Sequence, residues 1–142
     1  MKNSPLTNGN GKQEYDPIIH VVNTSSDNKL SGILFITSYP PRECGIATYS
    51  KDLIKALDHK FNQSFEIKVC ALESDDETYD YSDEVKYILN VDHPELFTKL
   101  AKIINTDPGI NSVVIQHEFG FFEKRKKDFI RLLALIKKPV IT

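Results

Sequence analysis

The sequence of 142 residues has little of what marks disulfide-rich, membrane-spanning or nucleic-acid-binding proteins. Its two cysteines exclude a disulfide scaffold and a zinc site built mainly from cysteine. No apolar run approaches the roughly 20 residues that cross a bilayer. The 18 Lys and Arg against 20 Asp and Glu give a net charge of −2, so the basic excess of a nucleic-acid binder is missing. The polar start of the chain and the few cysteines predict a cytoplasmic protein.

What the chain does have is the composition of a globular protein, with 40% hydrophobic and 27% charged residues. Residues 1–30 are rich in Asn, Ser, Gly and Pro and predict a flexible N-terminal tail. An apolar piece at residues 18–22 interrupts it, either as a weak strand or as a segment that docks on the body. Residues 31–142 show regular hydrophobic patterns and predict one domain.

Strand-like and helix-like patterns alternate along this domain. Apolar or alternating runs predict strands over residues 32–37, 65–71, 84–89, 112–116 and 139–142, and helical spacing predicts helices over 46–60, from 94 onward and over 129–136. This order predicts an α/β fold, a Rossmann-like and mostly parallel sheet with helices on both faces. Ligands of such sheets bind beyond the carboxyl ends of the strands, which directs attention to the loops after Thr37 and Gln116.

The loop after the first predicted strand has the features of a phosphate site. Gly45 stands at the start of a helix, where free N–H groups and the helix dipole favour an anion. Arg42 is placed to add a bidentate contact. The plainer alternative is a Pro-rich turn followed by a helix-entry glycine. Cys44 lacks a cysteine–histidine pattern around it, which favours a residue that fits the loop over a nucleophile.

The loop after the fourth predicted strand carries His117 and Glu118 at the end of a buried run. Histidine exchanges protons near neutral pH, and Glu118 is placed to orient it or to contact a sugar hydroxyl. The alternative is a structural histidine held by a backbone carbonyl. The other histidines are scattered, so no metal site is predicted.

Two charged segments have plain interpretations as solvated surface. Residues 73–84 are acidic but lack the spacing of a calcium loop, so we expect a solvated loop. Residues 123–127 are basic and fit an exposed helix start, with contact to phosphates or to an anionic membrane surface as the alternative.

The two loops together resemble the N-terminal domain of the retaining glycosyltransferases of family 4, which have the GT-B fold. The resemblance lies in residues 33–41 (ILFITSYPP), 44–49 (CGIATY) and 116–122 (QHEFGFF). Residues 138–142 (KPVIT) look like the start of the family's next strand. Many members have a Gly-Gly pair where this chain has Cys44 and Gly45.

The resemblance implies the transfer of a hexose from a nucleotide sugar to a sugar or lipid-linked acceptor, with retention and with no metal or other cofactor. It implies that Cys44, Gly45, Ile46 and Ala47 lie near the donor diphosphate and His117 near the transferred sugar. A second, C-terminal domain of the family holds most of the donor. We therefore expect residues 31–142 to be an incomplete acceptor-side domain that is inactive as a transferase by itself. The alternative is a non-catalytic Rossmann-like module that binds a nucleotide or a partner.

Overall fold

The computed structural model describes residues 30–116, 120 and 122–142, which form a five-stranded sheet and three α-helices. The elements in chain order are β1 (Ser31–Thr37), α1 (Gly45–Lys60), β2 (Phe65–Glu73), β3 (Val85–Asn90), α2 (Pro94–Thr106), β4 (Ser112–Ile115), a 3-10 turn (Glu123–Arg125), α3 (Lys126–Leu135) and β5 (Val140–Ile141). Each predicted strand and helix is present, with ends shifted by a few residues. The predictions for residues 1–29, including 18–22, and for His117, Glu118, Phe119 and Phe121 lie outside the described residues.

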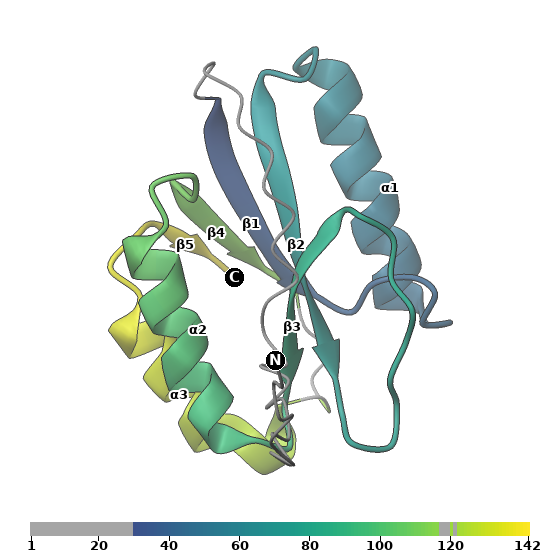
Figure 1. Ribbon diagram of the computed structural model, residues 1–142. Coiled ribbons are helices and arrows are strands. Elements are labelled where there is room, and N and C mark those ends of the chain that lie inside the picture. Colours follow the sequence, from purple (N-terminus) through teal and green to yellow (C-terminus); the bar gives the residue numbers. More distant parts are fainter. Residues whose placement is uncertain (1–29, 117–119, 121) are drawn as a thin grey trace, which may run out of the picture.

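The strands lie in the order β3-β2-β1-β4-β5, and every neighbouring pair is parallel (Figure 1). The predicted Rossmann-like α/β fold is therefore confirmed. The chain adds β2 and β3 on one side of β1 and then returns to add β4 and β5 on the other. This reversal puts the switch point between β1 and β4, where their carboxyl ends lie together.

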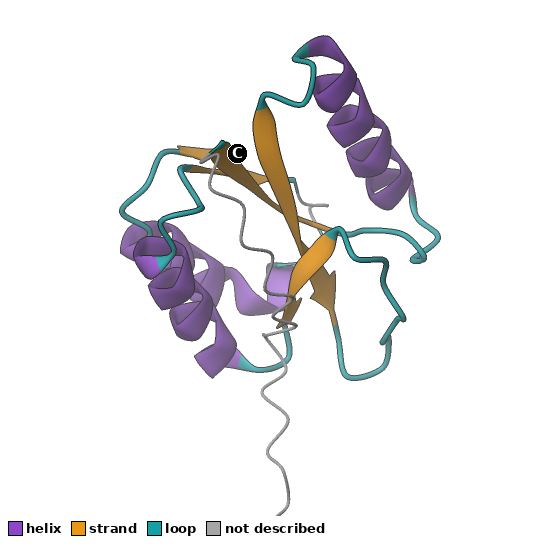
Figure 2. Cartoon of the chain, turned by 45° about the horizontal axis from the view of Figure 1, so that its top comes forward, coloured by secondary structure: helices purple, strands orange, loops and turns teal. Residues whose placement is uncertain are grey.

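Helices cover both faces of the sheet because side chains alternate along β1. Leu34 and Ile36 belong to the core under α2 and α3, whereas Phe35 belongs to the core under α1 with Ile54. Figures 1 and 2 show α1 on the opposite side of the sheet from the pair α2 and α3. The alternation explains why an unbroken apolar run formed a central strand.

The connection from β2 to β3, residues 74–84, joins two parallel strands and is described without a helix. Its tyrosine Tyr81 packs against the α1-side core. The prediction of a solvated loop was wrong for Glu73, which is the last residue of β2 and is 6% exposed. Its carboxylate accepts a hydrogen bond from the Tyr79 N–H (2.9 Å), which compensates its burial. The acidic residues from Asp75 to Glu77 are exposed as predicted.

The turn before β4 fits closely against the start of β1. Gly32 N–H donates to Asn111 Oδ1 (2.7 Å), and Gly32 O accepts from Asn111 N–H (2.8 Å). A Cβ at Gly32 would stand 1.5 Å from Gly109 O. Glycine at this position is therefore required by the close approach of two backbone segments.

Candidate functional site

The two loops that the sequence singles out begin side by side at the switch point. Ile36 of β1 is in register with Ile115 of β4, and the next residue, Gln116, donates its N–H to Ile36 O (3.0 Å). The loop after β1 starts at Ser38, which is 6% exposed. The carboxyl edge of the sheet thus brings together residues about 80 positions apart in the sequence, as expected for this fold.

A chain of side-chain hydrogen bonds joins these strand ends to α1. Ser50 Oγ donates to Gln116 Oε1 (2.6 Å) and lies 2.7 Å from Thr37 Oγ1. With the single Ser50 proton given to the amide oxygen, the Thr37 hydroxyl proton is shared between Ser50 Oγ and Ser38 O (3.1 Å). Thr37 and Ser50 are both fully buried. The helix that begins at Gly45 is therefore locked to the residue that precedes His117.

The start of α1 presents backbone N–H donors beyond its cap. Cys44 is the N-cap, and its Sγ accepts a hydrogen bond from Ala47 N–H (3.4 Å) while its carbonyl accepts from Thr48 N–H (3.2 Å). Among the described residues, no atom lies within 4 Å of a Cβ placed at Gly45, whereas Ala47 is fully buried. The amides of Gly45 and Ile46 precede the first hydrogen bond of the helix and are the donors that suit a phosphate.

Arg42 leans toward the β2–β3 connection. Its NH1 lies 3.0 Å from Glu77 Oε2, and its side chain is 17% exposed. Burial raises the pKa of the neighbouring Tyr81, the Glu73 carboxylate adds to that rise, and the positive charge of Arg42 opposes it. A bidentate contact from Arg42 to a phosphate would require it to exchange the Glu77 carboxylate for the ligand.

Tyr39 anchors the start of the same loop. Its ring is 1% exposed in the core under α1, and its hydroxyl donates to Glu84 Oε2 (2.5 Å). Burial, and then the hydrogen bond to the Glu84 carboxylate, raise the pKa of Tyr39 well above its ordinary range, so it stays protonated and a donor. The Pro40–Pro41 peptide bond that follows is cis. The loop is thus held at both Tyr39 and Arg42.

His117 and Glu118 lie outside the described residues, so their roles stay predictions. The structure describes the end of β4 and Gln116 immediately before them. In a parallel sheet a residue that follows a strand by one or two positions lies at the carboxyl edge, where ligands bind.

A second polar group lies at the ends of β2 and β3. Asp75 Oδ1 accepts from Asn90 Nδ2 (2.8 Å) and lies 2.9 Å from His93 Nε2, and His93 Nδ1 is 3.4 Å from Glu95 Oε1. The hydrogen bond to Asp75 raises the pKa of His93 and lowers that of Asp75. Within residues 30–116, 120 and 122–142, no three His, Cys, Asp or Glu side chains are arranged as metal ligands.

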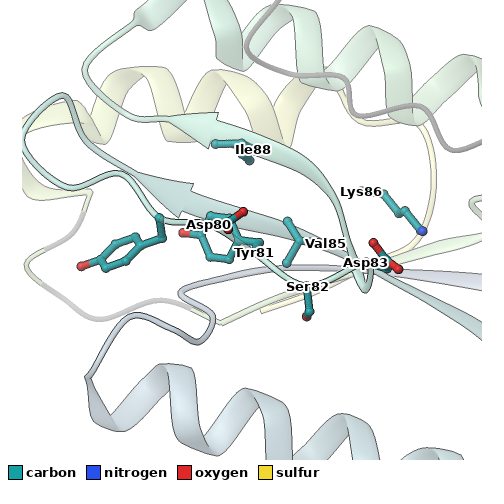
Figure 3. A pocket seen from close by; sticks show the side chains of 8 residues that line it. Asp80, Tyr81, Ser82, Asp83, Val85, Lys86 and Ile88 are labelled. Carbon is teal, nitrogen blue, oxygen red and sulfur yellow. The ribbon is translucent and has the colours of Figure 1, made fainter.

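A hollow of about 240 Å³ opens between β3 and the β2–β3 connection (Figure 3). Figure 3 shows Tyr81 and Val85 near the middle of the lining residues and Asp83 beside Lys86 at one end. None of the residues that line it is a predicted site residue. The hollow lies on the side of the sheet that carries α1, away from the switch point.

Sequence reasoning assigned no role to Ser50, Thr37 or Glu77. Ser50 had a detectable signal, because it lies three residues after Ala47 and four before Ile54, on the buried face of α1. A serine within an apolar stripe indicates a buried hydrogen-bond partner. Glu77 had no such signal, since the Arg42–Glu77 pair spans 35 positions and depends on how two loops meet.

Comparisons with known proteins add no family assignment to this geometry. In the part of the chain that the structure describes, no helix has the length and apolar content needed to cross a bilayer. The chain was compared with protein-family models, with curated proteins and with solved structures, and none of them matches it.

Proposed function

We propose that the chain is the N-terminal, acceptor-side domain of a retaining glycosyltransferase that moves a hexose from a nucleotide sugar to an acceptor hydroxyl. The observation that carries the proposal is the hydrogen-bond chain from Thr37 through Ser50 to Gln116. It joins, at the switch point of the sheet, the two loops whose residues resemble the family. Open α/β sheets bind their ligands at this point.

The donor diphosphate would lie at the start of α1. The amides of Gly45 and Ile46 would donate to phosphate oxygens, helped by the positive end of the helix dipole. The free space that the described residues leave around a Cβ at Gly45 supports the approach of a phosphate to the backbone there. Arg42 would supply a charged contact when Glu77 releases it.

The transferred hexose would lie between α1 and the loop after β4. His117 would contact the sugar and hold or move a proton near neutral pH, with Glu118 orienting it. The Ser50–Gln116 hydrogen bond would keep this loop at a constant distance from the diphosphate-binding amides. The opposite wall of the cleft belongs to a second domain, and both walls are needed to position donor and acceptor. The 142-residue chain alone would therefore transfer no sugar.

Diphosphate binding is tested by titrating the isotope-labelled chain with UDP, GDP and ADP and following amide NMR shifts. We expect the largest shifts at Gly45 and Ile46, and we expect Gly45→Val to abolish them by filling the open space. Lys55→Gln, on the exposed side of the same helix, is the matched control and should bind as the parent does. Equal binding by all three proteins would place the nucleotide elsewhere and contradict the proposal.

Transfer is tested on the protein isolated from its own cells with an antibody against this chain. We expect labelled hexose to pass to an acceptor with its anomeric configuration kept, and His117→Ala to lower the rate by about 10²-fold or more. A product with the inverted configuration would contradict a retaining enzyme.

A non-catalytic nucleotide- or partner-binding module is the second candidate. One observation favours it: the described residues themselves supply both the backbone amides at the start of α1 and the hydrogen bonds that link Thr37, Ser50 and Gln116. Diphosphate binding without transfer, by a native product whose mass is near 16.2 kDa, would select this candidate.

A further inference from the structure

The outward face of α3 combines positive charge with exposed aliphatic side chains. Six exposed residues recur at spacings that keep them on one side of the helix, whereas Leu132 is fully buried and Phe129 and Leu133 pack against the core shared with α2. The exposed residues are Lys126, Lys127, Ile130, Arg131, Ala134 and Leu135. Three of them are basic and none is acidic.

Two aliphatic members of this face are exposed. Ile130 is 53% exposed and Leu135 is 38% exposed. Each leaves apolar surface in water that burial would stabilise. They lie five positions apart, each directly beside or one turn from a basic residue of the face. Such a surface matches a boundary at which charged and apolar layers meet.

Charge is concentrated around α3. Residues 123–138 hold seven of the 18 Lys and Arg but two of the 20 Asp and Glu, a formal charge of +5. The whole chain carries −2, so the remaining residues carry −7. Arg125 is engaged at the surface by its own chain, where it donates to Asp92 O (2.9 Å) and lies 3.9 Å from Asp128. The other basic residues at the start of α3 lie on the exposed surface.

We propose that this face of α3 docks on an anionic lipid surface. Lys126, Lys127 and Arg131 would lie among the headgroup phosphates, and Ile130 and Leu135 would enter the acyl boundary. Charge complementarity selects the anionic partner, and the aliphatic residues select a lipid over a nucleic acid, whose bases stack on aromatic side chains.

Docking is measured by co-sedimentation of the 142-residue chain with vesicles of phosphatidylcholine, alone or with about 30 mol % phosphatidylglycerol. We expect binding to the anionic vesicles and little to the neutral ones. The variant Lys127→Glu with Arg131→Glu should bind at least about 25-fold more weakly, from about fivefold for each lost cation. The matched control, Lys55→Glu with Lys60→Glu on α1, makes the same change of charge on the other side of the sheet and should keep most of the binding.

A second variant separates lipid from other polyanions. Ile130→Ser with Leu135→Ser should weaken vesicle binding and leave any binding to heparin or duplex DNA unchanged. The proposal is overturned if the anionic vesicles do not bind the chain, if the α1 control loses as much as the α3 variant, or if the serine variant binds vesicles as tightly as the parent. If a variant does not give the circular dichroism spectrum of the parent, the charge contribution is tested on the parent chain itself. We then expect about 0.5 M salt to release the parent chain from anionic vesicles, and binding that persists in this salt overturns the proposal. Docking does not depend on transferase activity, so vesicle binding and hexose transfer succeed or fail separately.

Discussion

Replacing Ser50 with alanine tests whether the polar chain at the switch point holds α1 and the end of β4 together. The change removes the donor to Gln116 Oε1 and the acceptor for Thr37 Oγ1, at contacts of 2.6 and 2.7 Å. An unmade hydrogen bond of a buried group costs about 1–3 kcal/mol of unfolding free energy. Two features reduce this cost. Gln116 is half-buried, so its amide oxygen can bond water, and Thr37 Oγ1 lies 3.1 Å from Ser38 O, which accepts its proton. Alanine also favours the helix by a few tenths of a kcal/mol, about 0.5 at most.

We therefore expect Ser50→Ala to lower the unfolding free energy by about 1–2 kcal/mol. Urea unfolding followed by circular dichroism measures this. Thr98→Ala, at an exposed position of α2, is the control for helix propensity and should be neutral or slightly stabilising. Hydrogen exchange of the Gln116 amide, which bonds Ile36 O, should quicken in the Ser50 variant because the strand end loses its tie to α1.

The coupling between the partners is the sharper measurement. Gln116→Leu removes the other side of the hydrogen bond, and replacing both partners with apolar groups is close to neutral. The double variant should therefore cost less than the sum of the two single variants, by about 0.5 kcal/mol or more. Additive losses would refute the claim that Ser50 acts through Gln116. A Ser50→Ala variant as stable as the parent would refute the larger claim that this chain of hydrogen bonds positions the site.

The remaining predictions concern glycine, capping and pH. Gly32→Ala should lower the free energy of unfolding in urea by about 3 kcal/mol or more, because its Cβ would lie 1.5 Å from the Gly109 carbonyl oxygen. Gly45→Ala should be neutral or stabilising by up to about 1 kcal/mol, because its Cβ meets no atom of the described residues within 4 Å. Equal effects would contradict this contrast. Cys44→Ser should be more stable than Cys44→Ala by about 1 kcal/mol, because the hydroxyl replaces the thiol as acceptor for the helix cap, and equal melting temperatures would argue against the cap. The pKa of His93 is raised and that of Asp75 is lowered, so the charged pair stabilises the fold at acidic pH, as long as the pH stays above the pKa of Asp75. This stabilisation is lost as the pH rises through the pKa of His93. His93→Gln should thus lower the melting temperature more at about pH 6 than at about pH 9, and a difference independent of pH would contradict the pairing.

The strands and helices were predictable because their signals are local. The unbroken apolar run in β1 reflects burial of the strand on both faces of the sheet. The helical spacing of apolar residues in α2 reflects burial of one face of the helix. Glu73 was misplaced because an acidic residue beside an acidic segment suggests solvent. The backbone N–H of Tyr79 that satisfies its carboxylate becomes available only after the β2–β3 connection has folded over the strand end.

Some residues of the candidate site could likewise be predicted from local signals, and others could not. Gly45 at a helix start and the residues after β1 and β4 could be selected from sequence, since strand ends and helix starts have local signals. The partners of Arg42 and Ser50 could not. Arg42 reaches Glu77 and Ser50 reaches Gln116 because the chain reverses direction across the sheet, which brings together residues 35 and 66 positions apart.

Hydrophobic periodicity in the sequence therefore determined the element order and the α/β class, because each depends on side chains within one turn or one strand. It also selected the two loops of the candidate site, because strand ends have local signals. The strand order β3-β2-β1-β4-β5, the cap at Cys44, the engagement of Arg42 and the exposure of Ile130 and Leu135 on α3 emerged from the folded chain. They depend on which faces pack, and packing is decided by all the elements together.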